Sequence, residues 1–268
     1  VMRIVDTHCH LDFDTFSEDL EKIIDRARNV GVTKMITIST KLSNFPSLLN
    51  IASKYDGVSC SIGVHPHEAG REGQTELSDI LKYTSHPKVV GIGETGLDYY
   101  YDTSNSKVQM ESFLTHIDAA RTSKLPLIIH SRGADLDMIS VLEKEYSKGA
   151  FTGVLHCFTG SLALAQKAIE LGFYISISGI ITFKNSQELV STVKEIPLTN
   201  LLVETDAPYL APVPFRGKKN EPAYIIKTHE KLAEIMDVSI HQFAQITTTN
   251  AMTLFSKIAS HDNSSRKD

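Results

Sequence analysis

The chain has 268 residues, of which 41% are hydrophobic, 22% charged and 7% aromatic, and it contains no Trp. These values are typical of a globular protein and exclude a disordered or collagen-like chain. The 27 Lys and Arg residues against 32 Asp and Glu give a formal net charge of −5. A uniformly basic surface is therefore excluded, and any phosphate must be bound by cations gathered locally.

The cysteines and the apolar stretches indicate the compartment. Cys9, Cys60 and Cys157 form neither an even set nor a CxxC pair, so we expect free thiols and a cytoplasmic protein. The N-terminus lacks the apolar segment of a signal peptide, and the stretch 173–183 is well short of the ~20 residues that span a bilayer. No membrane partner is expected, and a chain of this length can be stable as a monomer.

Short β-branched runs recur along the chain, separated by segments with apolar residues three and four positions apart. This alternation is typical of βα units around a parallel sheet. In chain order, the predicted strands are Ile4–Cys9, Lys34–Ser39, Val58–Gly63, Val89–Glu94, Leu125–His130, Gly153–His156, Tyr174–Ser178 and Leu201–Glu204.

Eight strands, each followed by a helical pattern, favour an α/β fold of the (β/α)8 TIM-barrel type, as a single catalytic domain over residues 1–260. The alternative is a doubly wound sheet, which usually has fewer strands and a glycine-rich phosphate turn after the first one. Here the first strand leads into His10 instead. An extra C-terminal helix is predicted over Ile240–Ser256, and residues 261–268 are polar enough to form a disordered tail.

Histidines and carboxylates recur where the predicted strands end. His8 and His10 close the first strand, and alternation places both on one side while Cys9 turns away. Later strand ends carry Glu94, His130, His156, Glu204 and Asp206. Catalytic groups of TIM barrels lie at this end of the strands, and burying so many polar groups there without partners would be costly. A metal centre is therefore favoured over a structural role.

The chemistry of these side chains narrows the ion. Imidazole and carboxylate ligands suit Zn, Mn, Co or Fe, and Mg where water completes the shell. The six candidate ligands, His8, His10, Glu94, His130, His156 and Asp206, are too many for one tetrahedral zinc. We expect two divalent ions, Mg, Mn or Zn, with Glu94 bridging them. Such a pair activates water for displacement at phosphorus or at a carbonyl carbon.

Six short motifs carry a family resemblance. They are Asp6-Thr7-His8-Cys9-His10-Leu11, Gly63-Val64-His65-Pro66-His67, Gly93-Glu94-Thr95-Gly96-Leu97-Asp98-Tyr99, Ile129-His130-Ser131-Arg132, His156-Cys157-Phe158-Thr159-Gly160 and Glu204-Thr205-Asp206-Ala207-Pro208-Tyr209-Leu210. Nearly the whole chain resembles the TatD family of metal-dependent deoxyribonucleases, within the amidohydrolase-like barrels. The most specific piece runs from Glu204 to Pro222.

The resemblance implies a nuclease that removes nucleotides from the 3′ end of DNA, and also of RNA. It implies one ion held by His8, His10, Glu94 and Asp206, and another held by Glu94, His130 and His156. Relatives often place a basic residue shortly after the Gly-Leu-Asp triplet, whereas Tyr99, Tyr100, Tyr101 and Asp102 follow it here. One phosphate contact is thereby lost, while Tyr99 could stack on a base instead.

Three further residues have candidate roles in the chemistry. Asp206 can act as the general base while ligating metal, because one carboxylate oxygen can remain free. His65 is the best remaining acid or phosphate donor, and the alternative is a hydrogen-bonded loop histidine beside Pro66. Glu204 would orient another ligand. His67 is predicted to be structural, and Cys157 to be a core thiol that faces away from the site.

Cations for phosphate binding are expected from two loops. Arg132 follows His130 by two residues and could grip a phosphate through both guanidinium arms, or else pair with Asp135 or Glu94. Arg216, Lys218 and Lys219 place positive charge after the eighth strand, although the two lysines could equally be a solvated surface run.

Three functions remain open on sequence grounds. The first is a two-metal phosphodiesterase acting on nucleic acid ends. The second is a small-molecule amidohydrolase or lactonase, whose barrels often carry a carbamylated Lys where Glu94 stands here. The third is a non-catalytic, metal-stabilised scaffold that binds nucleic acid or protein.

Overall fold

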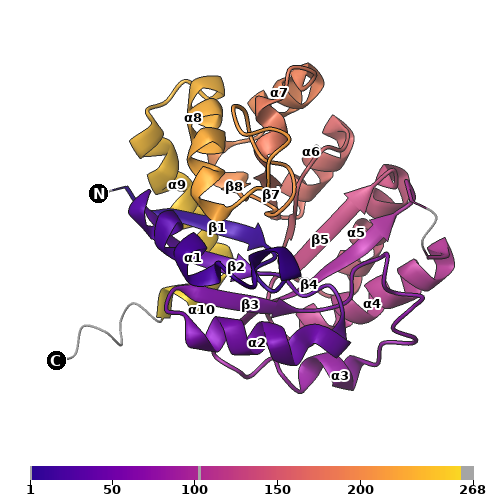
Figure 1. Ribbon diagram of the computed structural model, residues 1–268. Coiled ribbons are helices and arrows are strands. Elements are labelled where there is room, and N and C mark those ends of the chain that lie inside the picture. Colours follow the sequence, from indigo (N-terminus) through magenta and orange to yellow (C-terminus); the bar gives the residue numbers. More distant parts are fainter. Residues whose placement is uncertain (1, 102–103, 261–268) are drawn as a thin grey trace.

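The computed structural model describes residues 2–101 and 104–260. The predicted tail 261–268 and Asp102 of the tyrosine-rich loop lie outside the described residues. Within the described part, eight parallel strands form one sheet in chain order, with helices around it (Figure 1). The strands are β1 Ile4–Cys9, β2 Val32–Thr37, β3 Val58–Ile62, β4 Val89–Asp98, β5 Leu127–Arg132, β6 Gly153–Leu155, β7 Tyr174–Ile177 and β8 Leu201–Val203.

The first and last strands meet through the residues that follow β8. The amide of Asp206 donates to the carbonyl oxygen of His8 at 2.8 Å, and the amide of His10 donates to that of Ala207 at 2.8 Å. These bonds bring the two edges of the sheet together, as a barrel requires. The predicted TIM barrel is confirmed.

Helices follow the strands and pack their apolar faces on the outside of the sheet. In α1, for example, Ile23, Ile24 and Ala27 are buried, the three- and four-residue spacing of one helix face. The helices are α1 Leu20–Asn29, α2 Phe45–Lys54, α3 Leu77–Leu81, α4 Ser106–Ser123, α5 Asp135–Lys148, α6 Leu162–Glu170, α7 Gln187–Lys194, α8 Ile225–Ile235, α9 Ile240–Leu254 and α10 Ser256–Ser260.

A second apolar cluster lies inside the barrel. It joins Val5, Ile36, Val90, Ile128 and Leu202, which come from strands on different sides of the barrel, to Leu254 and Phe255 at the end of α9. Apolar packing therefore fills the barrel on the side where α9 ends, and the polar strand ends are left to form a site at the other side.

The largest difference from the predicted elements concerns β4, which continues beyond Glu94 to Asp98. Its last residues pair with β5, with Gly96 opposite His130 and Asp98 opposite Arg132. Gly96 allows this pairing, because a Cβ there would lie 2.0 Å from the carbonyl oxygen of His130. The predicted C-terminal helix is also divided, since α9 ends at Leu254 and α10 follows.

The cysteine prediction agrees with the structure, in which Cys9, Cys60 and Cys157 are free thiols. Within residues 2–101 and 104–260, every helix is too short or too polar to cross a membrane.

Candidate metal centre

A cavity of about 570 Å³ opens where the strands end, and it is bounded by the loops that follow them. Its walls include His10, His65, Glu94, His130, His156 and Asp206. His8 lies directly beneath, buried from solvent. The structure therefore brings together all six predicted metal ligands.

Glu94 lies at the centre of this group. Its Oε2 atom is 2.5 Å from Nε2 of His156 and 3.5 Å from Nε2 of His8. Nδ1 of His130 lies 3.7 Å from the same oxygen. On the β1 side, Oδ1 of Asp206 lies 3.2 Å from Nε2 of His10 and 3.5 Å from Nε2 of His8. The Glu94 carboxylate thus lies between two groups of ligand atoms, one from β1 and the end of β8 and the other from β5 and the end of β6.

Three of the four imidazoles are anchored through the nitrogen that points away from the centre. Nδ1 of His10 lies 3.3 Å from the carbonyl oxygen of Ile38, and Nδ1 of His156 lies 3.1 Å from Oε1 of Glu204. Nε2 of His130 lies 2.8 Å from Oδ2 of Asp98. When these nitrogens donate, the opposite ring nitrogens present lone pairs to the centre, which is the usual arrangement of histidines that bind metal.

His8 also indicates that a cation belongs at this site. Both of its ring nitrogens are buried without a hydrogen-bond partner among the described residues. An unsatisfied buried nitrogen is costly, and a bound metal ion would remove that cost. Imidazole and carboxylate donors in this number fit a divalent transition metal, so the residues present suit the ion that the sequence predicts.

The charges of the site favour an ionised Glu94. Burial acts to raise its pKa, but the electrostatic effect of His156, His65 and His8 acts in the opposite direction and is stronger. The pKa of Glu94 therefore lies well below its usual range. Burial lowers the pKa of His8, helped by the neighbouring His156. An ionised carboxylate beside a neutral imidazole is the protonation state that binds a metal ion.

The turn after β8 is held by a carboxylate that the sequence reasoning missed. Asp6 is fully buried and accepts hydrogen bonds from the amide of Thr205 at 3.0 Å, the hydroxyl of Thr205 at 2.5 Å and the amide of His8 at 3.2 Å. Asp6 thereby ties β1 to the segment that carries Asp206. Burial raises the pKa of Asp6 to about 7, although these hydrogen bonds oppose the shift.

His65 reaches the site from the loop after β3. Its Nδ1 accepts the amide of His67 at 3.0 Å, so the proton of the neutral ring is on Nε2. That nitrogen lies 3.7 Å from Oε1 of Glu94. Burial lowers the pKa of His65 to about 3, which keeps the ring neutral. His65 is thus a hydrogen-bond donor that faces the centre, the geometry required of the predicted phosphate donor.

Asp98 is a second residue to which the sequence reasoning gave no role. Besides His130, its Oδ2 contacts Nε2 of His67 at 2.9 Å, and its Oδ1 accepts the amides of Tyr100 and Tyr101. The signal was present: Glu94 and Asp98 are four residues apart, so a strand that continued past Glu94 would turn both side chains to one side. His67, predicted to be structural, holds this carboxylate at the cavity wall.

The loop after β4 places Tyr99 beside the metal centre, and its predicted stacking on a base stays a prediction. The Tyr99 hydroxyl donates to Asp137 at 2.7 Å, and its side chain lines a neighbouring cavity rather than the metal centre. Tyr101 lines the centre instead. Arg132 lies over the rings of Tyr100 and Tyr101, at 4.1 and 4.9 Å from their centroids. The alternative of an Arg132 salt bridge with Asp135 or Glu94 is not found among the described residues, and the Asp135 carboxylate accepts the amide of Ser161.

The cations after β8 lie outside the cavity wall. Arg216 packs over the ring of Phe183 at 4.1 Å, and Lys219 donates to the carbonyl oxygen of Thr15. Arg216 and Lys218 are exposed, and their predicted contact with phosphate stays a prediction. Cys157 was expected to face away from the site, yet it lines the cavity. Its φ of +44° ends the extended alternation after His156, so the thiol turns inward.

Comparison with known proteins places these features in a family. The family model described as TatD related DNase matches residues 5–256, most of the chain. The chain belongs to the TatD family. It is 43% identical to an uncharacterised metal-dependent hydrolase of Buchnera aphidicola, covering 95% of this chain and 99% of that protein. It is 39% identical to the uncharacterised metal-dependent hydrolase YabD of Bacillus subtilis, covering 94% and 98%.

A solved structure agrees with this assignment. YjjV, a TatD homologue from Escherichia coli, superposes with a TM-score of 0.89 at 31% identity, over 95% of this chain and 98% of that one. The resemblance drawn from the six motifs is confirmed. This TatD-family protein is a metal-dependent hydrolase whose clustered histidines and carboxylates are able to bind metal.

Proposed function

We propose that this TatD-family hydrolase is a monomeric phosphodiesterase that removes nucleotides from the 3′ end of DNA, and also of RNA, with two divalent ions, Mg, Mn or Zn. The observation that carries the proposal is the central place of Glu94 between two groups of ligand atoms. The description of the matching family as TatD related DNase supports the choice of substrate.

Glu94 would belong to both ion sites. His8, His10 and Asp206 would complete one of them, and His130 and His156 the other. The anchored rings of His10, His130 and His156 support this division, because each presents a lone pair to the centre. When bound, the ions supply an activated water and stabilise the charge on the phosphoryl oxygens.

The protein residues would then position the substrate and move protons. Asp206 is suited to accept the proton of the attacking water, because Oδ1 faces His8 and His10 while Oδ2 has no partner among the described residues. The Nε2–H group of His65 is suited to donate to a phosphoryl oxygen. Arg132, exposed at the cavity wall, would bind the phosphate of the next nucleotide.

The first experiment compares substrates. Single-stranded DNA with a 3′ label is incubated with Mg, Mn or Zn, or with chelator, beside a panel of esters and lactones. We expect release of the 3′ nucleotide that depends on added metal. Turnover of lactones or esters alone would identify a small-molecule hydrolase, and metal binding without any turnover would identify a scaffold.

A pair of variants tests the part played by His65. We expect His65→Gln to lower turnover while metal is retained, because the ring donates to substrate rather than to an ion. His86→Gln is the matched control: Nδ1 of His86 also accepts the amide two residues ahead, but His86 precedes β4, away from the cavity. Loss of metal from His65→Gln would make His65 a ligand and overturn its assigned role.

A further inference from the structure

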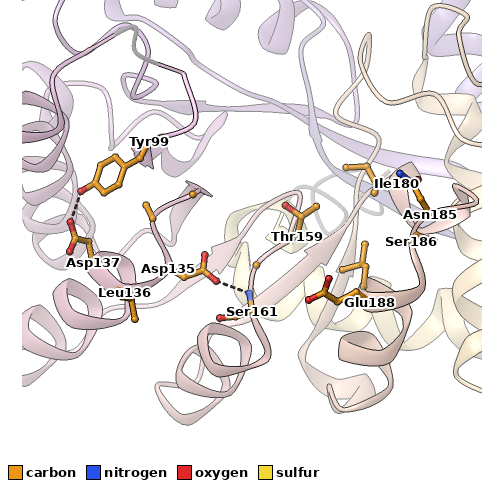
Figure 2. A pocket seen from close by; sticks show the side chains of 14 residues that line it. Tyr99, Asp135, Leu136, Asp137, Thr159, Ser161, Ile180, Asn185, Ser186 and Glu188 are labelled. Atoms are coloured by element: carbon orange, nitrogen blue, oxygen red, sulfur yellow. Dashed lines mark hydrogen bonds between the residues drawn. The ribbon is translucent and has the colours of Figure 1, made fainter.

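A second and larger cavity adjoins the metal centre. It measures about 790 Å³. Its walls come from Tyr99 after β4, from the first turns of α5 and α7, and from the segments that precede α5, α6 and α7. Thr159 and Ile180 line both cavities, so the two lie side by side. In Figure 2, Tyr99 and Asp137 lie on one side of the pocket and Ile180 and Glu188 on the other.

The two cavities differ in charge. The walls of the second cavity carry three carboxylates, from Asp135, Asp137 and Glu188, and none of its lining residues is Lys, Arg or His. The metal cavity contains Arg132 and five histidines besides its carboxylates. Phosphate is therefore repelled from the second cavity, and at the metal centre it would be held by Arg132 and the bound ions.

The carboxylates of the second cavity keep acceptor capacity for a ligand. Asp135 uses one oxygen for the amide of Ser161 at 2.6 Å, and Asp137 uses one for the hydroxyl of Tyr99 (Figure 2). Glu188 is exposed and has no hydrogen bond or ion pair with another described residue. An ionised carboxylate can only accept, so the ligand must supply N–H or O–H donors.

Apolar surface lies beside these acceptors. Leu136, at the start of α5, is 84% exposed, and Ile180, Leu189 and the ring of Tyr99 also line the cavity. Apolar walls with a few polar groups are typical of pockets that bind small organic ligands. A neutral heterocycle with N–H donors on one edge matches both the apolar walls and the acceptors.

We infer that the second cavity binds the base of a nucleotide next to the phosphate that is cleaved. This inference rests on the proposed phosphodiesterase function, and it adds base selectivity to that function. Guanine is the best match, because its N1–H and its amino group can donate side by side to one carboxylate. Thymine offers a single N–H group, and the carbonyl oxygens on both sides of it are repelled by a carboxylate.

The test measures nucleoside binding directly, without turnover. Deoxyguanosine and thymidine are titrated separately into the purified protein, and binding is followed by saturation-transfer NMR. We expect deoxyguanosine to bind about fivefold more tightly or better, the lower range for a two-donor contact. Glu188→Ala should reduce this preference, and Leu136→Arg should weaken binding of both nucleosides by narrowing the cavity.

Glu111→Ala is the matched control, an exposed glutamate on α4 outside both cavities, and it should keep the wild-type preference. Equal binding of the two nucleosides, a preference unchanged in Glu188→Ala, or wild-type affinity for both nucleosides in Leu136→Arg would overturn the inference.

A separate assay distinguishes this outcome from failure of the proposed function. Bis(4-nitrophenyl) phosphate is a phosphodiester without a base, so its metal-dependent hydrolysis reports the chemistry alone. Hydrolysis of this diester without selective nucleoside binding would refute the base subsite but would agree with the proposed phosphodiesterase function. Selective binding of deoxyguanosine without diester hydrolysis would support the pocket and refute the phosphodiesterase.

Discussion

Nε2 of His130 lies 2.8 Å from Oδ2 of Asp98, on the side of the ring that faces away from Glu94. When Nε2 donates to Asp98, the neutral ring carries its lone pair on Nδ1, the nitrogen that faces the centre. Asp98 also raises the pKa of His130 against the effect of burial. Since Asp98 also holds His67, one carboxylate orients a histidine of β5 and another of the loop after β3.

The first prediction follows from this contact. Asp98→Asn should lower metal affinity by about 10- to 100-fold, because an amide is a weaker acceptor and no longer selects the tautomer of His130. Competition titration against a chelator measures the affinity. Asp79→Asn on α3, where the carboxylate is half-exposed, is the control. Wild-type affinity in Asp98→Asn would show that His130 needs no such support.

The second prediction concerns Glu94 as a shared ligand. Glu94→Gln should lose metal from both positions and most of its turnover, because a neutral amide cannot balance the charge of two cations. Elemental analysis after dialysis measures the metal. Glu68→Gln is the control, since Glu68 lines the same cavity but pairs with Arg71. Full metal content in Glu94→Gln would end the bridging assignment.

The third prediction separates ligation from base catalysis at Asp206. Asp206→Asn keeps one oxygen ligand and the side-chain size but removes the base. We expect metal and oligonucleotide to remain bound while single-turnover rates fall by about 10²- to 10⁴-fold, roughly 3 to 5 kcal/mol. If excess metal restores the full rate, Asp206 is only a ligand.

The fourth prediction tests the close approach of β4 to β5. Gly96→Ala would place a Cβ 2.0 Å from the carbonyl oxygen of His130 at a φ of +141°, so the strands must separate. We expect a loss of about 3 kcal/mol in the free energy of unfolding, measured with denaturant. Gly172→Ala, also at positive φ but with no atom within 4 Å of the added Cβ, should cost about 1 kcal/mol. If the two variants lose equal free energy of unfolding, the backbone strain at positive φ accounts for the loss, and the clash with His130 does not.

The fifth prediction is a pH dependence of stability from two buried histidines. Burial lowers the pKa of His116 and of His229 to about 4 from 6.5. The unfolded chain therefore takes up protons first, and stability that is complete above pH 6.5 is lost as the pH falls toward 4. Each ring contributes up to about 3 kcal/mol to this loss.

His229→Gln tests this dependence. Its free energy of unfolding, compared with that of the wild type between pH 7 and pH 4.5, should show a gap that narrows with falling pH. A gap that stays constant would mean that His229 does not drive the acid loss. His241→Gln on α9 provides an exposed control.

The sequence by itself determined the barrel and the members of the centre. Runs such as Val58–Ile62 and Leu127–Arg132 show their strand character locally, because β-branched residues favour the pleated, half-buried surface of a sheet. The same pattern also shows where each buried strand ends, and so which polar residues stand at the strand ends. His8, Glu94 and His156 were therefore identifiable before any contact among them was known.

Only the tertiary structure decided how those residues are used. The anchors of the histidines, at Ile38, Asp98 and Glu204, come from β4 and from the residues that follow β2 and β8. Glu204 was predicted to orient a ligand, but only the structure pairs each anchor with its histidine. The inward turn of Cys157 depends on a single backbone torsion that ends the strand alternation. The continuation of β4, which moves Tyr99 out of the metal cavity, depends on pairing with β5. In each case the outcome depends on a contact between residues distant in the chain or on a local bend of the backbone. A pattern of alternating side chains shows neither of these.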